Sequence, residues 1–333
     1  MLRNKKKNPI YFFLIVVVLL VALGFGGYAW HESYIQSPAD SQAEKVTFVV
    51  EEGDTPTEVA LRLEEKGIIR SAKVFLKAFA EQRDQVVLQP GNFKVSAAMT
   101  PKEVIEALQD TTTDFKITFL EGWRVEQMAQ KLEKEMNIPQ ADFLKIAKEG
   151  YMFPDTYFFN PDDTVDMVAS KMQQTFEKKY DADLKQKVQK LGLSDTQAIV
   201  LASLVEREGR SDKVRQEVAS IMLKRLKMGM KLDIDATVRY AMDTSLYKAN
   251  NNFSKWWDHI TPEDYQAVKS PYNTYLTNSL PPSPICNPSL SSLKAVANAD
   301  PSTPYVYYYH DPEGNSHYAK TLEEHNSNVQ RYK

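Results

Sequence analysis

Residues 194–208, SDTQAIVLASLVERE, contain the pattern that decides the fold of the larger part of this chain. Ser194 and Gln197 have the spacing of a capping box, in which two side chains satisfy free backbone N–H groups at the start of a helix. The residues that follow, 198–205, are apolar on almost every side of that helix. A helix without a polar face is typical of a protein interior. The stretch therefore predicts a buried central helix.

Two glutamates end this helix. Because successive helical residues are about 100° apart, Glu206 and Glu208 face roughly opposite ways, so one can face a cleft while the other faces solvent. A carboxyl group at the end of a buried helix loses hydration, which favours its neutral form. A neutral carboxylic acid can protonate a leaving oxygen, as glycosidases do. The alternative is that Glu206 begins the polar end of the helix and pairs with an arginine, and the pattern alone favours that alternative.

The composition is that of a folded protein with an acidic body. Of 333 residues, 43% are hydrophobic and 26% are charged, which excludes a wholly disordered chain. The formal net charge is -3, although Arg3 and three lysines make the first nine residues basic. An acidic body argues against nucleic acid as a partner, since phosphates need a basic face. The single cysteine, Cys286, allows no intramolecular disulfide.

Residues 10–30 carry no charge and are long enough to cross a bilayer as a helix. The basic residues 1–9 should stay in the cytoplasm, which places the rest of the chain outside. We therefore expect a single-pass protein of the plasma membrane, with residues 31–45 as a polar linker. The alternative is a cleaved signal peptide.

A motif recurs in the next segment at an interval of 45 residues. Thr55-Pro-Thr-Glu-Val and Thr100-Pro-Lys-Glu-Val each follow an alternating strand and begin a helix with a capping box and an N1 proline. A looser third copy contains Glu121-Gly122. The first copy resembles a LysM module, a domain that binds N-acetylglucosamine polymers. Residues 46–110 are thus expected to form a small LysM-like α+β module, which either holds glycan or acts as a spacer.

The remainder, 111–333, is expected to be a mixed α+β domain. A Tyr-rich segment at 305–309 and a turn predict a hairpin, and Thr321 caps a final helix. The segment 244–268 is expected to be a loop. Helices are predicted at 125–136, 140–149, 163–190, 195–208 and 212–228.

Other kinds of chemistry find little support in the residues. The five histidines lack the spacing of metal ligands. There is no glycine-rich phosphate loop outside the uncharged span, and no Gly-x-Ser-x-Gly motif of a serine hydrolase. We therefore expect neither a metal nor a cofactor.

Several motifs stand out in residues 149–325. They are LASLVERE at 201–208, EGYMFPDTY at 149–157, DATVRY at 235–240, SPYNTY at 270–275, LPPSPICNP at 280–288 and HYAKTLEEH at 317–325. Together they resemble the motifs of the YceG-like family of endolytic murein transglycosylases, in which the first corresponds to the segment ASIVEKE. Departures from the family pattern are Ala236 for a proline and Ala241, Ser279 and Ser283 for glycines.

This resemblance, which covers residues 10–333, implies an enzyme that cuts within peptidoglycan glycan strands, with Glu206 as its catalytic acid and base. Glu206 would protonate the β-1,4 glycosidic oxygen and then deprotonate the muramoyl C6 hydroxyl, giving a 1,6-anhydro product. Asp235, Tyr272 and Asn273 are candidate substrate-binding or supporting residues; for Tyr272 and Asn273, purely structural roles are equally compatible. Expected partners are glycan strands, the cytoplasmic membrane and peptidoglycan synthases of the elongation or division machinery.

Two other functional classes remain open from the sequence. One is a glycoside hydrolase that uses Asp235 as its second carboxylate. The other is a non-catalytic scaffold that binds the cell wall.

Overall fold

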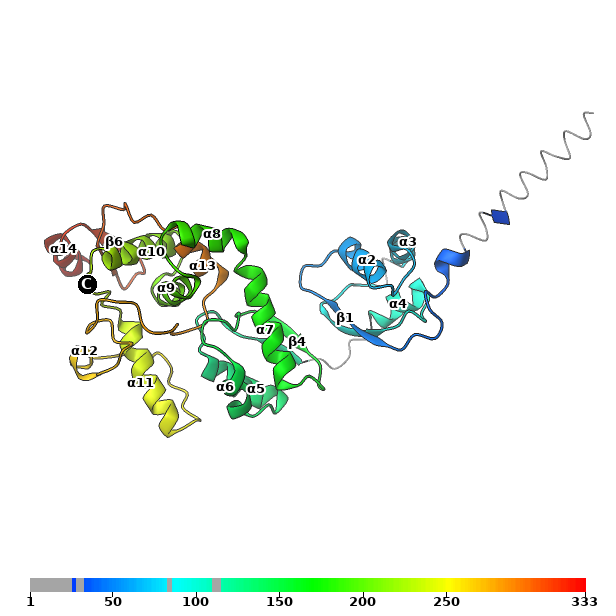
Figure 1. The fold of residues 1–333 in the computed structure, drawn as a ribbon, viewed down its shortest axis with the longest axis horizontal. Helices are drawn as coiled ribbons and strands as arrows, with labels where there is room; N and C mark the ends of the chain where they lie inside the picture. Colours follow the sequence, from blue (N-terminus) through cyan, green and yellow to red (C-terminus); the bar gives the residue numbers. More distant parts are fainter. Residues whose placement is uncertain (1–25, 28–32, 83–85, 110–114) are drawn as a thin grey trace, which may run out of the picture. The chain divides into compact units, whose positions relative to one another are not determined.

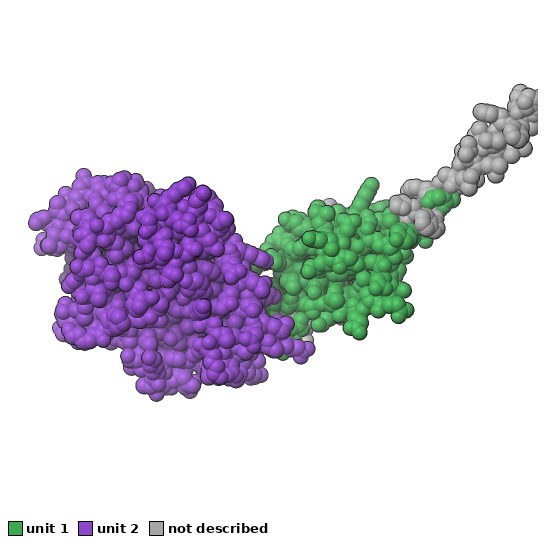
Figure 2. Space-filling view, in the orientation of Figure 1, with its two compact units in different colours: residues 1–114, 158–161 green, residues 115–157, 162–333 purple. Residues whose placement is uncertain are grey.

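The computed structural model describes residues 26–27, 33–82, 86–109 and 115–333. The chain divides into two compact units (Figure 2), the first comprising residues up to 114 together with 158–161 and the second comprising 115–157 and 162–333. The predicted span 10–30 lies outside the described residues, apart from Gly26 and Gly27. Among the helices in the described ranges, none has the length and apolar character needed to cross a membrane.

The first unit has a small antiparallel sheet and its own core (Figure 1). Its two strands pair with Phe48 opposite Phe93, and both rings are buried with Phe75. Thr55 and Thr100 form capping boxes, each with a proline in the first helical turn, so both predicted helix starts are confirmed. In chain order the elements are β1 (Val46–Val50), α2 (Pro56–Glu65), α3 (Ala72–Glu81), β2 (Gly91–Val95) and α4 (Pro101–Ala107).

The second unit is built around α9 (Asp195–Glu208). Ser194 and Gln197 form the predicted capping box, and residues 198–205 are all buried. The helices α10 (Asp212–Lys227) and α13 (Leu290–Ala297) pack against α9, as Figure 1 shows. The predicted buried central helix is confirmed.

The other elements surround this core or extend the chain beyond it. They are β3 (Phe115–Thr118), α5 (Val125–Met136), α6 (Gln140–Ile146), β4 (Thr156–Phe159), α7 (Val165–Lys179), α8 (Ala182–Lys190), α11 (Asp235–Ala249), α12 (Asp264–Ala267), β5 (Tyr307–His310), β6 (Ser316–Ala319) and α14 (Leu322–Tyr332). β3 pairs with β4, and β5 pairs with β6 in an antiparallel hairpin. The hairpin and the final helix, capped by Thr321, were both predicted. The mixed α+β class is confirmed.

Two predicted helices have different boundaries. The helix expected at 163–190 is interrupted, because Tyr180 leaves helical geometry and Asp181 accepts a hydrogen bond from the backbone N–H of Leu184, which starts α8. The helix expected at 140–149 ends at Ile146, and the chain then continues as a loop.

The sequence prediction missed α11. In this helix four buried residues, 237–240, follow one another directly, so there is no amphipathic period to reveal it. The segment 244–268, expected to be a loop, contains the last turns of α11 and the short α12.

Candidate active site

The carboxylate of Glu206 lies at the C-terminal end of α9, with its side chain only 4% exposed. Its Oε2 accepts three hydrogen bonds: from the backbone N–H of Ser289 (2.8 Å), the hydroxyl of Ser289 (2.6 Å) and the hydroxyl of Ser292 (2.7 Å). Its Oε1 accepts one, from Nη2 of Arg215 (3.1 Å). Both sequence interpretations thus describe part of the geometry, since Glu206 is buried and also pairs with an arginine.

The three donors on Oε2 come from the start of α13. Ser289 is the N-cap of this helix, and its Oγ accepts a hydrogen bond from the N–H of Ser292 while its hydroxyl is within donor distance of Glu206. A helix N-terminus carries a partial positive charge that favours a nearby carboxylate. The residues PSLSSL at 288–293 therefore form a polar cap that holds one carboxylate in a fixed orientation.

The loop before α13 is tied to the loop after α6 by one buried amide. Oδ1 of Asn287 accepts hydrogen bonds from the N–H groups of Gly150 (2.9 Å) and Met152 (3.0 Å). Its Nδ2 donates to Oε1 of Glu149 (2.9 Å) and to the carbonyl of Trp123 (3.0 Å). Burial raises the pKa of Glu149 well above its ordinary value. Asn287 thus joins the motifs at 149–157 and 280–288 beside Glu206.

Gly122 brings a further segment of backbone against Glu206. Its φ is +73°, and a Cβ at this position would lie 3.4 Å from Cγ of Glu206 and 3.1 Å from Nη1 of Arg207. Its N–H donates to the carbonyl of Asn287 (3.0 Å). The side chain of the neighbouring Glu121 is largely exposed, yet partial desolvation of its carboxyl group and the charge of Glu206 raise its pKa. Glu121 was not among the predicted site residues, although the Glu121-Gly122 motif had been recognised as part of a repeat.

Glu208 does not simply face solvent. It is partly buried, and its Oε2 accepts a hydrogen bond from the hydroxyl of Tyr308 (3.1 Å). Burial raises the pKa of Glu208 to about 7, and the carboxylate of Asp235 acts in the same direction. The sequence analysis allowed one of the two glutamates to face solvent, and the structure exposes Glu208 only in part. The partner of Glu208, Tyr308, comes from the Tyr-rich segment at 305–309, which the sequence analysis had identified only as part of a hairpin.

Asp235 begins α11 and is exposed. Its Oδ1 accepts a hydrogen bond from the hydroxyl of Tyr275 (2.5 Å), and its Oδ2 lies 3.5 Å from the hydroxyl of Tyr265. The rings of these tyrosines stack with centroids 4.1 Å apart. A carboxylate beside two stacked aromatic rings is a surface on which a sugar can lie.

Tyr272 and Asn273 lie in the same segment but make structural contacts. Asn273 is fully buried, and its amide donates to the carbonyls of Tyr265 and Val268 and accepts from the N–H of Tyr275. The hydroxyl of Tyr272 lies 2.6 Å from Oγ of Ser283, and its ring packs against the core. These contacts favour the structural alternative for both residues: they support the chain that presents Tyr265 and Tyr275.

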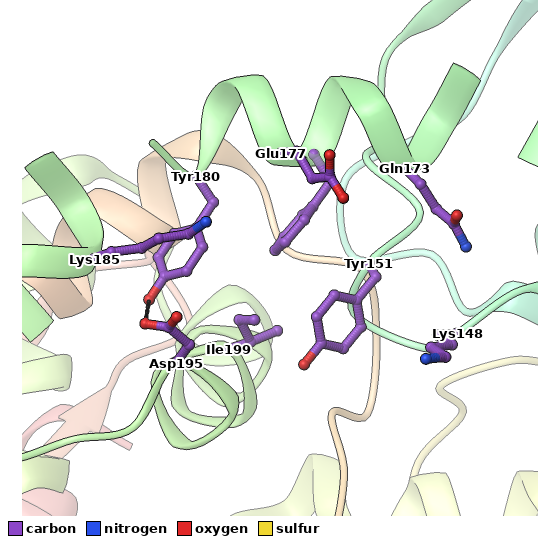
Figure 3. A pocket seen from close by; sticks show the side chains of 9 residues that line it. Lys148, Tyr151, Gln173, Glu177, Tyr180, Lys185, Asp195 and Ile199 are labelled. Carbon is purple, nitrogen blue, oxygen red and sulfur yellow. Dashed lines mark hydrogen bonds between the residues drawn. The ribbon is translucent and has the colours of Figure 1, made fainter. Parts of the chain in front are cut away.

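A separate pocket of about 400 Å³ lies near the N-terminal end of α9 (Figure 3). Tyr151 and Tyr180 point into it, and the hydroxyl of Tyr180 donates to Asp195 (3.3 Å), as the dashed line shows. None of the predicted site residues lines this pocket. Its walls come from Lys148, Tyr151, Gln173, Phe176, Glu177, Tyr180, Lys185, Asp195 and Ile199.

Metal ligands do not gather anywhere in the described part of the chain: no group of three or more His, Cys, Asp or Glu side chains there could hold an ion. The fold and the site define a mixed α+β protein in which one glutamate at the end of a central helix is held by serine and arginine side chains. The model of the YceG-like family matches residues 48–331, and the chain belongs to that family.

Curated relatives and a solved structure agree with this assignment. The chain is 28% identical to the endolytic murein transglycosylase of Bacillus subtilis, over 92% of this chain and 90% of that protein. It is 25% identical to the endolytic murein transglycosylase of Streptococcus pneumoniae, over 96% of this chain but only 64% of the longer relative. A crystal structure of a YceG-like protein from Listeria monocytogenes superposes with a TM-score of 0.55 at 27% identity, covering 86% of this chain and 99% of that one.

Proposed function

We propose that this protein is an endolytic lytic transglycosylase that cuts the β-1,4 bond between N-acetylmuramic acid and N-acetylglucosamine in nascent glycan strands. Its family and the names of its relatives support this proposal. The observation that carries it is the Glu206 carboxylate, which is buried, oriented by four donors and located where the family motif has its catalytic glutamate.

In the proposed reaction, Glu206 donates a proton to the glycosidic oxygen as the bond to C1 breaks. The resulting carboxylate accepts the proton of the muramoyl C6 hydroxyl, whose oxygen then bonds to C1 and closes the 1,6-anhydro ring. One carboxyl group is sufficient because the nucleophile belongs to the substrate, whereas a hydrolase normally uses two. No cofactor takes part in this scheme.

The hydrogen bonds of Glu206 indicate which oxygen would exchange the proton. Each carboxylate oxygen has about two lone pairs, and Oε2 already accepts three donors from Ser289 and Ser292. Oε1 accepts only the hydrogen bond from Arg215. We therefore assign proton donation and acceptance to Oε1, with Arg215 stabilising the carboxylate between the two steps.

Substrate binding is proposed to involve Asp235 with the stacked rings of Tyr265 and Tyr275. Aromatic faces cover the apolar face of a sugar, while a carboxylate accepts hydrogen bonds from its hydroxyl groups. Tyr272 and Asn273 would contribute indirectly, by fixing the segment that carries Tyr275.

The N-terminal part is proposed to hold the enzyme near its substrate. The uncharged residues 10–30 would anchor it in the cytoplasmic membrane with the body outside, where it could meet peptidoglycan synthases. The first unit would act as a LysM-like module that holds glycan. Support for this comes from its separate core and its strand–helix–helix–strand order.

The deciding experiment is mass spectrometry of muropeptides released from isolated sacculi by the full-length protein in detergent. A transglycosylase gives anhydro-muramoyl ends. New reducing muramoyl ends would instead establish a two-carboxylate hydrolase, with Asp235 as the first candidate for the second carboxylate. Binding to sacculi without any released fragment would establish a non-catalytic scaffold.

A further inference from the structure

Arg207 lies beside the proposed acid but takes no part in holding it. Its Nη1 and the Cγ of Glu206 converge on the same point next to Gly122, 3.1 Å and 3.4 Å from where a Cβ would stand. The side chain is partly exposed. Arg207 and Glu206 therefore border one surface, and a group bound at Arg207 would be close to the bond that Glu206 cleaves.

The guanidinium of Arg207 lacks the partners that comparable arginines have. Arg124, Arg215 and Arg239 each form an ion pair with a carboxylate. Across the described ranges, no carboxylate pairs with Arg207. Its Nε is buried without a hydrogen-bond acceptor, as are those of Arg215 and Arg239, but those two arginines have a carboxylate on another nitrogen. A guanidinium has five N–H donors in a plane that matches a carboxylate or carbonyl group. A buried donor left unpaired costs free energy, which a bound acceptor would recover.

A strained tryptophan holds this guanidinium in place. The guanidinium carbon of Arg207 lies 4.1 Å from the centre of the Trp257 ring, the geometry of a cation–π contact. Trp257 has a φ of +60°, which is a rare conformation for a bulky residue. Its N–H donates to the buried Asp243 (3.0 Å), and its indole N–H lies 3.4 Å from Oε1 of Gln127. Strain of this kind persists where the surroundings enforce it, and it is concentrated at functional sites.

We propose that Arg207, positioned by Trp257, binds the lactyl carboxyl group of the substrate's muramoyl residue. This inference rests on the proposed function, because it identifies which part of the glycan lies next to Glu206. N-acetylmuramic acid differs from N-acetylglucosamine by this lactyl group. The group is a carboxylate on strands without stem peptides and an amide carbonyl where a peptide is attached. Both forms are planar acceptors, so Arg207 would select the sugar whose C1 is attacked.

The test is steady-state kinetics of the full-length protein on two substrates, strands with stem peptides and strands from which an amidase has removed them. Arg207→Met should raise KM about tenfold on both, the effect expected from losing a charge-assisted hydrogen bond, with little change in kcat. Arg207→Lys should recover more binding on stripped strands, since it keeps the charge but loses the planar fork. Trp257→Leu should raise KM to an intermediate extent.

Arg210→Met is the matched control, because Arg210 is an exposed arginine three residues further along the chain, beyond the end of α9 and outside the proposed site. It should leave KM unchanged. An effect of Arg207→Met on one substrate alone would assign the acceptor to the carboxylate or to the carbonyl. An unchanged KM, or a fall in kcat alone, would overturn the proposal.

Sedimentation with sacculi, using Arg207→Met in a Glu206→Gln background, separates this inference from the proposed function. Weaker binding than that of Glu206→Gln alone supports Arg207 as a binding residue even if no transglycosylase product is ever found. Equal binding of a folded double variant refutes it. If Arg207→Met does not fold, the same comparison is made with Arg207→Lys on strands that carry stem peptides.

Discussion

At the scale of single residues, the two glutamates near the end of α9 have different hydrogen-bond partners. Glu206 accepts hydrogen bonds from Ser289, Ser292 and Arg215, whereas the partly buried Glu208 accepts one from a tyrosine hydroxyl. The sequence indicated that both glutamates lie at the end of a buried helix and that their side chains point in different directions. It could not show which partners each would meet, because those partners come from segments up to 100 residues away.

Replacing Glu206 with glutamine should remove the transferable proton while keeping the shape of the side chain. General acid–base catalysis contributes roughly 10²–10⁴ in rate, so release of anhydro-muropeptides should fall at least about a hundredfold. The measurement is product formation from sacculi, with the melting temperature as a check on folding. Glu208→Gln is the control and should retain most of the activity. A folded Glu206→Gln protein with near-normal activity would disprove the assignment.

The second residue-scale prediction concerns pH and Glu208. Because burial raises its pKa to about 7 from an ordinary value of 4.5, the unfolded chain loses this proton before the folded chain does. The contribution of Glu208 to stability is therefore complete below about pH 4.5 and is lost as the pH rises to about 7. The loss amounts to at most about 3 kcal/mol.

Glu208→Gln cannot ionise, so its stability relative to the unchanged protein should improve between pH 4.5 and pH 8. Thermal melting of both proteins across this range measures the difference, in which the other titrating groups largely cancel. A difference that stays constant with pH would mean that Glu208 ionises normally in the folded protein.

At the scale of elements, sequence patterns located those helices that carry a local signal. The capping box and apolar run of 194–208 gave the bounds of α9, and two further capping boxes gave the starts of α2 and α4. In contrast, α11 was missed because its burial does not follow a helical period. The interruption between α7 and α8 depends on a cap at Asp181 that propensity alone did not reveal.

Ser289 has two roles: it is the N-cap of α13, and its hydroxyl donates a hydrogen bond to the carboxylate of Glu206. Ser289→Ala should lower the free energy of unfolding by about 1 kcal/mol, the usual cost of losing an N-cap. It should also reduce activity about tenfold through the lost hydrogen bond to a charged group. Denaturant unfolding and product formation measure the two effects.

Ser211→Ala provides the comparison, because Ser211 caps α10 in the same way but has no hydrogen bond to Glu206. It should show a similar loss of stability with activity unchanged. Equal activity of the two variants would show that the Ser289 hydroxyl serves the helix alone.

At the scale of the whole molecule, the basic residues 1–9 and the uncharged residues 10–30 predict a cytoplasmic N-terminus and an external body. Protease added to intact protoplasts should therefore degrade both compact units. Protection of the body until the membrane is permeabilised would show that the orientation is reversed. A cytoplasmic protein examined in the same protoplasts serves as the control for leakage.

The hydrogen bonds of Asn287 join segments that are distant in sequence, and this affects the point in synthesis at which the enzyme can become active. Gly122, Gly150, Glu206 and Ser289 lie far apart in the chain, and they meet only where Asn287 and the start of α13 close on the end of α9. A chain whose synthesis has not yet reached Ser289 has Glu206 and Arg215 but lacks the serine donors that complete the orientation of the carboxylate. The enzyme is therefore inactive while it is being made, because the last third of the polypeptide must be synthesised and folded before the site can cut a glycan strand.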